Sequence, residues 1–189
     1  MARRVRRLFR GGRIVDLGAG HGLLGQMLLL IDDSSSAAFV VDKALAPSAV
    51  KVHETLARTW PRIAGRVTFL TVGLDAFELS DPDVVVSSHA CGALTDVVLA
   101  RAVAVRARVA VLPCCHDLAT CDAGDLGGWL DRPAAIDVIR ACRLKASGYR
   151  VWTQTISADI TPKNRLLLGA PRSDSTLGAP NGASLAATR

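Results

Sequence analysis

Residues 13–22, RIVDLGAGHG, constrain the fold of this chain more than any other segment. The apolar first half predicts a buried strand that ends near the acid Asp16, and three glycines follow at alternating positions. Glycine has no Cβ atom, so the backbone of such a turn can pass close against a bound ligand. The apolar residues 23–31 then predict a helix. A strand, a glycine-rich turn and a helix together seat a nucleotide-like cofactor in doubly wound α/β domains.

Two kinds of cofactor compete for this turn. Residues 20–25 match the dinucleotide fingerprint G-x-G-x-x-G, which predicts a nicotinamide cofactor. The wider pattern resembles the first motif of class I S-adenosylmethionine (SAM) methyltransferases, which surrounds the methionine end of SAM. Asp16 would repel the pyrophosphate of a dinucleotide but attract the cationic amino group of SAM, so SAM is favoured over both a dinucleotide and an empty turn. The cofactor residues expected here are Asp16, Gly18, Ala19, Gly20 and Gly22.

The rest of the chain alternates between apolar runs and turn signals, as expected of an α/β fold. Further strands are predicted at residues 37–41, 67–72, 84–86, 109–112, 149–156 and 165–168. Helices are predicted at residues 47–60 and 133–147, and another ends near Val105. No helix separates the last two strands, so they predict an antiparallel hairpin. We expect a doubly wound, Rossmann-like sheet of seven strands, mostly parallel, with this hairpin at its C-terminal end.

The net charge of +6 is concentrated at the N-terminus. Six of the 23 lysines and arginines lie in residues 1–13, and the other 17 balance the 17 acidic residues. Arginine side chains bind phosphate, so residues 1–12 predict a basic arm through which RNA could bind. The domain itself is expected at residues 13–170. The Ser, Gly, Ala and Pro content of residues 171–189 predicts a disordered tail.

The cysteine content indicates the compartment. There are five cysteines, an odd number that argues against a disulfide framework and predicts a reducing, cytoplasmic location. No apolar run approaches the roughly 20 residues of a membrane span, so no membrane partner is expected.

Two motifs near the middle of the chain narrow the resemblance. They are His89-x-Cys91-Gly92 with Thr95-Asp96, and Cys114-Cys115-His116. Residues 13–170 resemble a class I SAM-dependent methyltransferase domain, and the two motifs resemble one subgroup of that superfamily. The subgroup includes the eukaryotic enzymes that O-methylate tRNA ribose in the acceptor stem, and uncharacterised methyltransferase-like proteins.

This resemblance implies SAM-dependent methyl transfer, with S-adenosylhomocysteine (SAH) as the product of the cofactor. RNA, either tRNA or rRNA, is the leading substrate. The alternatives are a methyltransferase for a protein or a small molecule, and a catalytically silent module that binds SAM or RNA. A protein partner that supplies substrate recognition is a further alternative.

The rest of the cofactor site is expected at the carboxyl ends of the next three strands. Asp42 lies 20 positions beyond Gly22, where doubly wound folds place the acid that binds ribose hydroxyls, and Lys43 follows it. The resemblance implies adenine-binding residues after the third strand and residues that flank the transferred methyl group after the fourth. The residues assigned to these roles are Asp75, Ala76 and Phe77 for adenine, and Ser88 and His89 for the methyl group.

The candidate catalytic bases are histidines. An oxygen nucleophile must lose its proton during methyl transfer, and histidine is suited to accept it near neutral pH. His89 and His116 both follow strands at the active edge, and Asp117 or Asp96 is expected to orient the histidine. Residues 120–131 contain three glycines and predict a flexible lid or substrate loop.

Cysteines at the same edge suggest two further chemistries. With the histidines they could bind zinc, but the adjacent Cys114 and Cys115 cannot easily ligate one tetrahedral ion, so no metal is expected. Cys91 or Cys115 could instead attack a pyrimidine ring and direct methylation to carbon. Cysteine is also a common small hydrophobic residue of protein cores. In the last polar loop, Lys163 or Arg165 could contact a substrate that bears phosphate.

Overall fold

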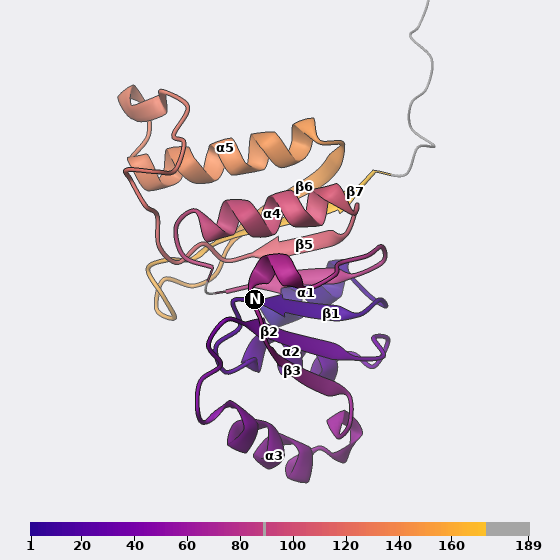
Figure 1. Ribbon diagram of the computed structural model, residues 1–189. Helices are drawn as coiled ribbons and strands as arrows, with labels where there is room; N and C mark the ends of the chain where they lie inside the picture. The colour runs from indigo at the N-terminus through magenta and orange to yellow at the C-terminus, as the bar shows by residue number, and fades with distance from the viewer. Residues whose placement is uncertain (89, 173–189) are drawn as a thin grey trace, which may run out of the picture.

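The computed structural model describes residues 1–88 and 90–172 (Figure 1). Its centre is one seven-stranded sheet in the order β3-β2-β1-β4-β5-β7-β6. The strands are β1 (Ile14–Leu17), β2 (Ala38–Asp42), β3 (Val67–Thr71), β4 (Val84–Ser87), β5 (Arg108–Val111), β6 (Tyr149–Thr155) and β7 (Arg165–Pro171).

The first five strands run parallel, so their carboxyl ends form one edge of the sheet. Asp16 of β1 lies opposite Val40 of β2 and Val86 of β4. β7 runs antiparallel between β5 and β6. The predicted seven-stranded, mostly parallel sheet with a C-terminal antiparallel hairpin is therefore confirmed. The strand order reverses between β1 and β4, which is the switch point where open α/β sheets bind ligands.

Helices cover both faces of the sheet (Figure 1). One face carries α1 (Ala2–Leu8), α2 (Leu23–Ile31) and α3 (Ala49–Thr59), and the other carries α4 (Leu94–Ala104) and α5 (Arg132–Ala146). The 3-10 turns η1 (Pro61–Ile63), η2 (Leu74–Ala76) and η3 (Leu126–Gly128) lie in the connections. None of the described helices has the length and apolarity that a membrane crossing requires.

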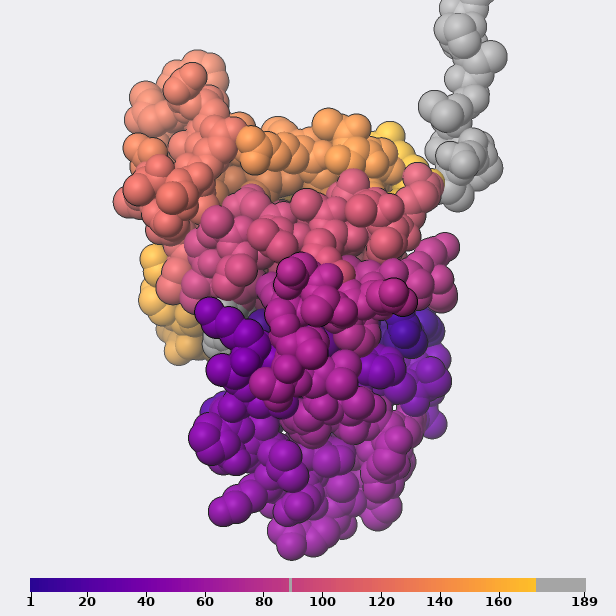
Figure 2. Space-filling model, viewed as in Figure 1, coloured from indigo at the N-terminus to yellow at the C-terminus, as the bar shows by residue number. Residues whose placement is uncertain are grey.

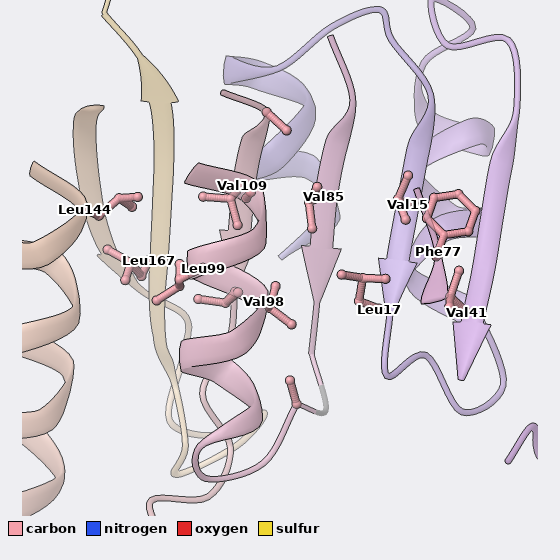
Figure 3. Close-up of a cluster of buried hydrophobic side chains, with 14 of the residues drawn as sticks. Val15, Leu17, Val41, Phe77, Val85, Val98, Leu99, Val109, Leu144 and Leu167 are labelled. Carbon is pink, nitrogen blue, oxygen red and sulfur yellow. The ribbon is translucent and has the colours of Figure 1, made fainter. Parts of the chain in front are cut away.

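Alternating side chains of the central strands build two apolar layers, one on each face. Val15 and Leu17 of β1 join the layer that includes α4 and α5, whereas Ile14 joins the layer that includes α1 and α2. Figure 3 shows Val98 and Leu99 of α4 packed over the strands in the first of these layers. Because central parallel strands are buried on both faces, β1 and β4 consist mainly of aliphatic residues.

The N-terminal residues differ from the predicted basic arm. Residues 2–8 form α1, and its apolar side packs into the core, where Val5 and Phe9 are at most 1% exposed. The ring of Phe9 meets that of Trp152 edge-on, with centroids 6.0 Å apart. Arg6 is also buried, and its guanidinium donates to the carbonyl of Leu28 at 3.0 Å. This segment is therefore packed on the sheet and does not project from it.

Candidate functional site

The glycine-rich turn joins β1 to α2 at the switch point. Gly18, Gly20 and Gly22 all have positive φ, at +66°, +56° and +68°, a conformation that favours glycine. A Cβ atom on Gly22 would lie 2.6 Å from the side chain of Val40, so a larger residue does not fit there. A Cβ atom on Gly20 would meet nothing within 4 Å, so the turn faces open space at that position. The backbone of the turn is therefore accessible to a ligand at Gly20.

Asp16 lies beneath this turn and is 1% exposed. Its Oδ2 accepts a hydrogen bond from the backbone N–H of Gly25 at 2.9 Å, whereas its Oδ1 has no partner among the described residues. Burial, opposed by the hydrogen bond from Gly25 and reinforced by the nearby charge of Asp42, raises the pKa of Asp16 to about 7. A buried carboxylate oxygen with no donor fits a ligand that brings a cation, such as the amino group of SAM.

Asp42 is the last residue of β2, and its carboxylate is hydrogen-bonded to the glycine turn. Its Oδ2 accepts from the N–H of Gly20 at 2.9 Å, and its Oδ1 accepts from the N–H of Ala44 at 3.1 Å. Each oxygen keeps a second lone pair, so the carboxylate can still accept a ribose hydroxyl. Asp16 and Asp42 thus lie on either side of one glycine turn, and their roles toward SAM remain predictions. Ala19 is buried in the turn, and Lys43 is exposed beside Asp42.

The three residues expected to bind adenine do not share one environment in the structure. Asp75 and Ala76 are exposed in η2, which follows β3, the neighbour of β2 in the sheet. Phe77, however, is only 8% exposed, and its ring packs on that of Phe39 with centroids 5.4 Å apart. The guanidinium of Arg13 lies 5.8 Å from the same ring. Phe77 is therefore a core residue (Figure 3), and its assignment to adenine stacking is corrected.

His116 has a partner on α5 that its position in the sequence does not reveal. Its Nε2 lies 2.8 Å from Oδ1 of Asp137 in α5, and the imidazole is 3% exposed. The other ring nitrogen, Nδ1, is buried and has no hydrogen-bond partner within residues 1–88 and 90–172. Asp137 also accepts from Arg165 at 2.7 Å and from Arg140 at 3.3 Å, so one carboxylate holds a histidine and two arginines.

Neither acid that was expected to orient this histidine does so. The carboxylate of Asp117 accepts from the hydroxyl and N–H of Thr120 and from the N–H of Ala119, and these bonds lower its pKa. Asp96 instead makes two bonds to Arg140, at 2.7 and 3.0 Å. The sequence held one signal for Asp137, because Asp137 and Arg140 lie three residues apart on the helix predicted at residues 133–147. The side of the helix that they share could not be read from that spacing alone.

The loops after β4 and β5 meet at the carboxyl edge. The N–H of Gly92 donates to the carbonyl of Cys115 at 3.0 Å. The Sγ atoms of Cys91, Cys114 and Cys115 all lie within 4.8 Å of one another, and those of Cys91 and Cys114 are 3.0 Å apart. A cavity of about 410 Å³ opens between the loops. It is lined by Cys91, Gly92, Ala93, Leu94, Val97, Cys115, His116 and Asp117.

The state of Cys91 bears on its expected role as a nucleophile. Its hydrogen bond with Cys114, then burial, then its contact with Cys115 raise its pKa to about 12. A thiol with that pKa stays protonated at neutral pH and is a poor nucleophile. Of the residues expected to flank the methyl group, Ser88 is half-buried after β4, and His89 lies outside the described residues.

Two more segments border the same edge. In the segment between β5 and α5, the coral part that leads into α5 projects from the body of the molecule at the upper left of Figure 2. Trp129 in this segment is 87% exposed, which is rare for so large an apolar side chain. In the loop between β6 and β7, Lys163 is exposed, whereas Arg165 is bonded to Asp137. A larger cavity, about 680 Å³, lies between α5 and the β6–β7 hairpin; most of its lining is apolar, but Asp137 and Arg165 also line it.

Comparison with known proteins adds independent information. A family model described as a methyltransferase domain matches residues 3–121, more than half of the chain. Comparison with curated proteins finds no match. Several solved structures share the fold. An O-methyltransferase family protein from Burkholderia thailandensis has a TM-score of 0.56 at 18% identity, over 86% of this chain and 51% of that one.

Two further structures have names that refer to TrmK. M. capricolum TrmK, solved in complex with SAH, has a TM-score of 0.57 at 12% identity, over 90% of this chain and 66% of that one. The B. subtilis M1A22 tRNA methyltransferase TrmK has a TM-score of 0.56 at 14% identity, over 92% and 65%. This chain thus spans between half and two thirds of the length of these three proteins. At such low identities the likeness to them is one of fold.

Proposed function

The chain belongs to the methyltransferase domain family, and we propose that it transfers a methyl group from SAM to RNA, either tRNA or rRNA. The observation that carries the cofactor assignment is the glycine turn, which Asp42 holds at Gly20 and beside which Asp16 is bonded to Gly25 of α2. The Oδ1 of Asp16, which has no partner among the described residues, fits the cationic amino group of SAM, and the open space at Gly20 leaves room for the cofactor. When bound, SAM supplies a methyl group on a cationic sulfonium, which the substrate nucleophile displaces in line.

The His116–Asp137 pair supports a proton-accepting role beside this cofactor. Because Asp137 accepts from Nε2, the proton of a neutral imidazole is fixed there and Nδ1, which is buried in this structure, is the nitrogen left to accept a proton once the substrate reaches it. His116 lines the cavity between the loops after β4 and β5, on the carboxyl edge that also carries the glycine turn. The adjacent Asp137 would stabilise the imidazolium that forms when the nucleophile loses its proton.

RNA as the substrate is supported by charge and by an exposed aromatic ring at this edge. The guanidinium of Arg4 in α1 donates to the carbonyl of Thr155 at the end of β6, so the start of α1 lies near the loop that carries Lys163. Arg3 is exposed on the same turn of helix. Trp129 offers a flat face on which a base can stack, and such stacking contributes about 1–3 kcal/mol per base.

The test is transfer of a radiolabelled methyl group from SAM to purified tRNA and rRNA, with a Trp129→Ala variant. We expect methylated RNA that disappears on nuclease treatment, and an approximately tenfold rise in the KM for RNA in the variant. Trp60→Ala is the matched control, because Trp60 is 46% exposed at the end of α3 and should leave the KM unchanged. Label that enters protein or small molecules and resists nuclease would refute RNA as the substrate, and the absence of any labelled product would favour a silent binding module.

The cellular location is proposed on the chemistry of the thiols. All five cysteines are free, and three of them have sulfur atoms within 4.8 Å of one another. Such thiols persist in a reducing compartment, so we place this enzyme in the cytoplasm. A protein partner that presents the RNA is compatible with the exposed segment around Trp129.

A further inference from the structure

The three cysteines at the carboxyl edge form a cluster that methyl transfer does not use. Cys91 follows β4, and Cys114 and Cys115 follow β5, so the cluster joins two loops that are distant in sequence. We propose that the thiols of Cys91, Cys114 and Cys115 bind one Zn²⁺ ion and leave its fourth position open toward the cavity between these loops. Thiolates are preferred ligands of zinc, and three protein ligands with one open position are typical of catalytic zinc sites.

The sulfur positions are close to those that zinc needs. A tetrahedral ion with Zn–S bonds of about 2.3 Å requires Sγ atoms roughly 3.8 Å apart. The three Sγ atoms lie within 4.8 Å of one another, and those of Cys91 and Cys114 are 3.0 Å apart. Both the upper limit of 4.8 Å and the Cys91–Cys114 separation of 3.0 Å are within about 1 Å of the required value, a change that side-chain rotation can supply.

The local backbone allows the adjacent Cys114 and Cys115 to bind the same ion, because they do not lie in an extended strand. In an extended strand, successive side chains point to opposite faces, so Cys114 and Cys115 would diverge. β5 ends at Val111, however, and residues 112–117 have no regular secondary structure. There the chain turns so that both sulfurs lie beside Cys91.

The backbone that carries the cysteines is held in place. The N–H of Gly92 donates to the carbonyl of Cys115 at 3.0 Å, which ties the two loops directly. The carbonyl of Gly92 in turn accepts from the guanidinium of Arg140 at 2.8 Å. Arg140 is 2% exposed and also holds Asp96 and Asp137, so both loops are fixed to α4 and α5. A site whose ligands are held in this way loses little entropy when the ion binds.

The binding step needs no oxidant. Three S–H bonds are replaced by three Zn–S bonds, and three protons pass to solvent, so zinc affinity should rise with pH. The open fourth position would take a water molecule or a substrate atom from the cavity, which His116 and Asp117 also line. The site would therefore place a Lewis acid at the edge where the substrate is expected. The zinc proposal stands on the sulfur geometry and does not depend on methyl transfer.

The experiment measures bound zinc in the full chain by elemental analysis, after reduction and removal of free metal. We expect about one zinc ion per chain, a rise in the unfolding temperature on adding zinc, and charge-transfer absorption when cobalt(II) replaces zinc. Cys91→Ser and Cys115→Ser should each weaken zinc binding by at least tenfold. Cys142→Ser, at an exposed thiol on α5, should change nothing.

Three results would overturn the proposal. The first is zinc retention by Cys91→Ser equal to that of the unchanged chain, with circular dichroism showing that both are folded. The second is zinc that binds the unchanged chain and a folded Cys91, Cys114, Cys115 triple-serine variant equally. The third is a reduced, folded protein that binds no zinc and forms only a Cys91–Cys114 disulfide in air.

Discussion

At the scale of single residues, Asp16 has one oxygen bonded to the N–H of Gly25 and one oxygen without a described partner. Withdrawal of a carboxyl group from water is unfavourable for its charged form, which is why its pKa rises to about 7. A cationic ligand would restore the charged form by supplying the missing partner. The same atom therefore destabilises the free protein at neutral pH and favours binding of SAM.

This gives a prediction for Asp16→Asn. The folded-state pKa of about 7 exceeds the ordinary value of 3.8, so the stability that the protonated acid contributes is present below pH 3.8 and is lost as pH rises through 7. Asparagine does not ionise. Between about pH 5.5 and about pH 8, the unfolding temperature of the variant should therefore gain roughly 5 °C relative to the unchanged protein. Glu78→Gln, at an exposed acid, is the control and should show no such gain. A constant difference across this pH range would contradict the assignment.

At the scale of elements, α1 is the helix whose role differs most from expectation. Its arginines suggested an arm, yet Val5 and Phe9 are buried on one side of it, and Arg6 bonds to the carbonyl of Leu28 in α2. The spacing of Val5, Leu8 and Phe9 was a helical signal that the charge obscured. Burial of Arg6 depends on acceptors in α2 and at Ser35, which no local pattern reveals.

The Phe9→Ala variant tests how much the packing of α1 contributes to the stability of the domain. Loss of a buried aromatic side chain that packs on Trp152 should lower the free energy of unfolding by about 3 kcal/mol in denaturant titrations. Arg7→Ala removes an exposed side chain of the same helix and should stay within about 0.5 kcal/mol of the unchanged protein. Equal, small effects of both changes would mean that the segment behaves as a free arm.

At the scale of the whole molecule, the sheet was predictable because its pattern is local. Buried strands such as β4 are continuous aliphatic runs, and the absence of a helix between residues 156 and 165 indicated the antiparallel hairpin. The positions of Asp16 and Asp42 at the switch point were predictable because topology alone decides them, whereas their roles toward SAM stay predictions. The site was not predictable where side chains from distant elements meet. Asp137 reaches His116 across 21 positions, and Cys91 reaches Cys114 across 23.

Phe77 is a residue that the sequence placed in the site but that the structure places in the core. Its position after β3 suggested the adenine site, but the chain turns back there and buries the ring between Phe39 and Arg13. The direction of a loop after a strand depends on the packing of its apolar residues, and that packing is set by the assembled sheet. The carboxyl edge as a whole was thus foreseen, whereas the orientation of individual side chains along it required the structure.

Calorimetric titration of SAM, SAH and NAD measures whether the glycine turn beside Asp16 and Asp42 binds SAM. We expect SAM and SAH to bind and NAD to give no heat of binding. Asp42→Ala should weaken both SAM and SAH by about 10- to 100-fold, because a charged hydrogen-bond acceptor is lost. Glu54→Ala, at an exposed acid on α3, should bind as the unchanged protein does. Binding of NAD without SAM, or SAM affinity unaltered by the loss of Asp42, would contradict the account.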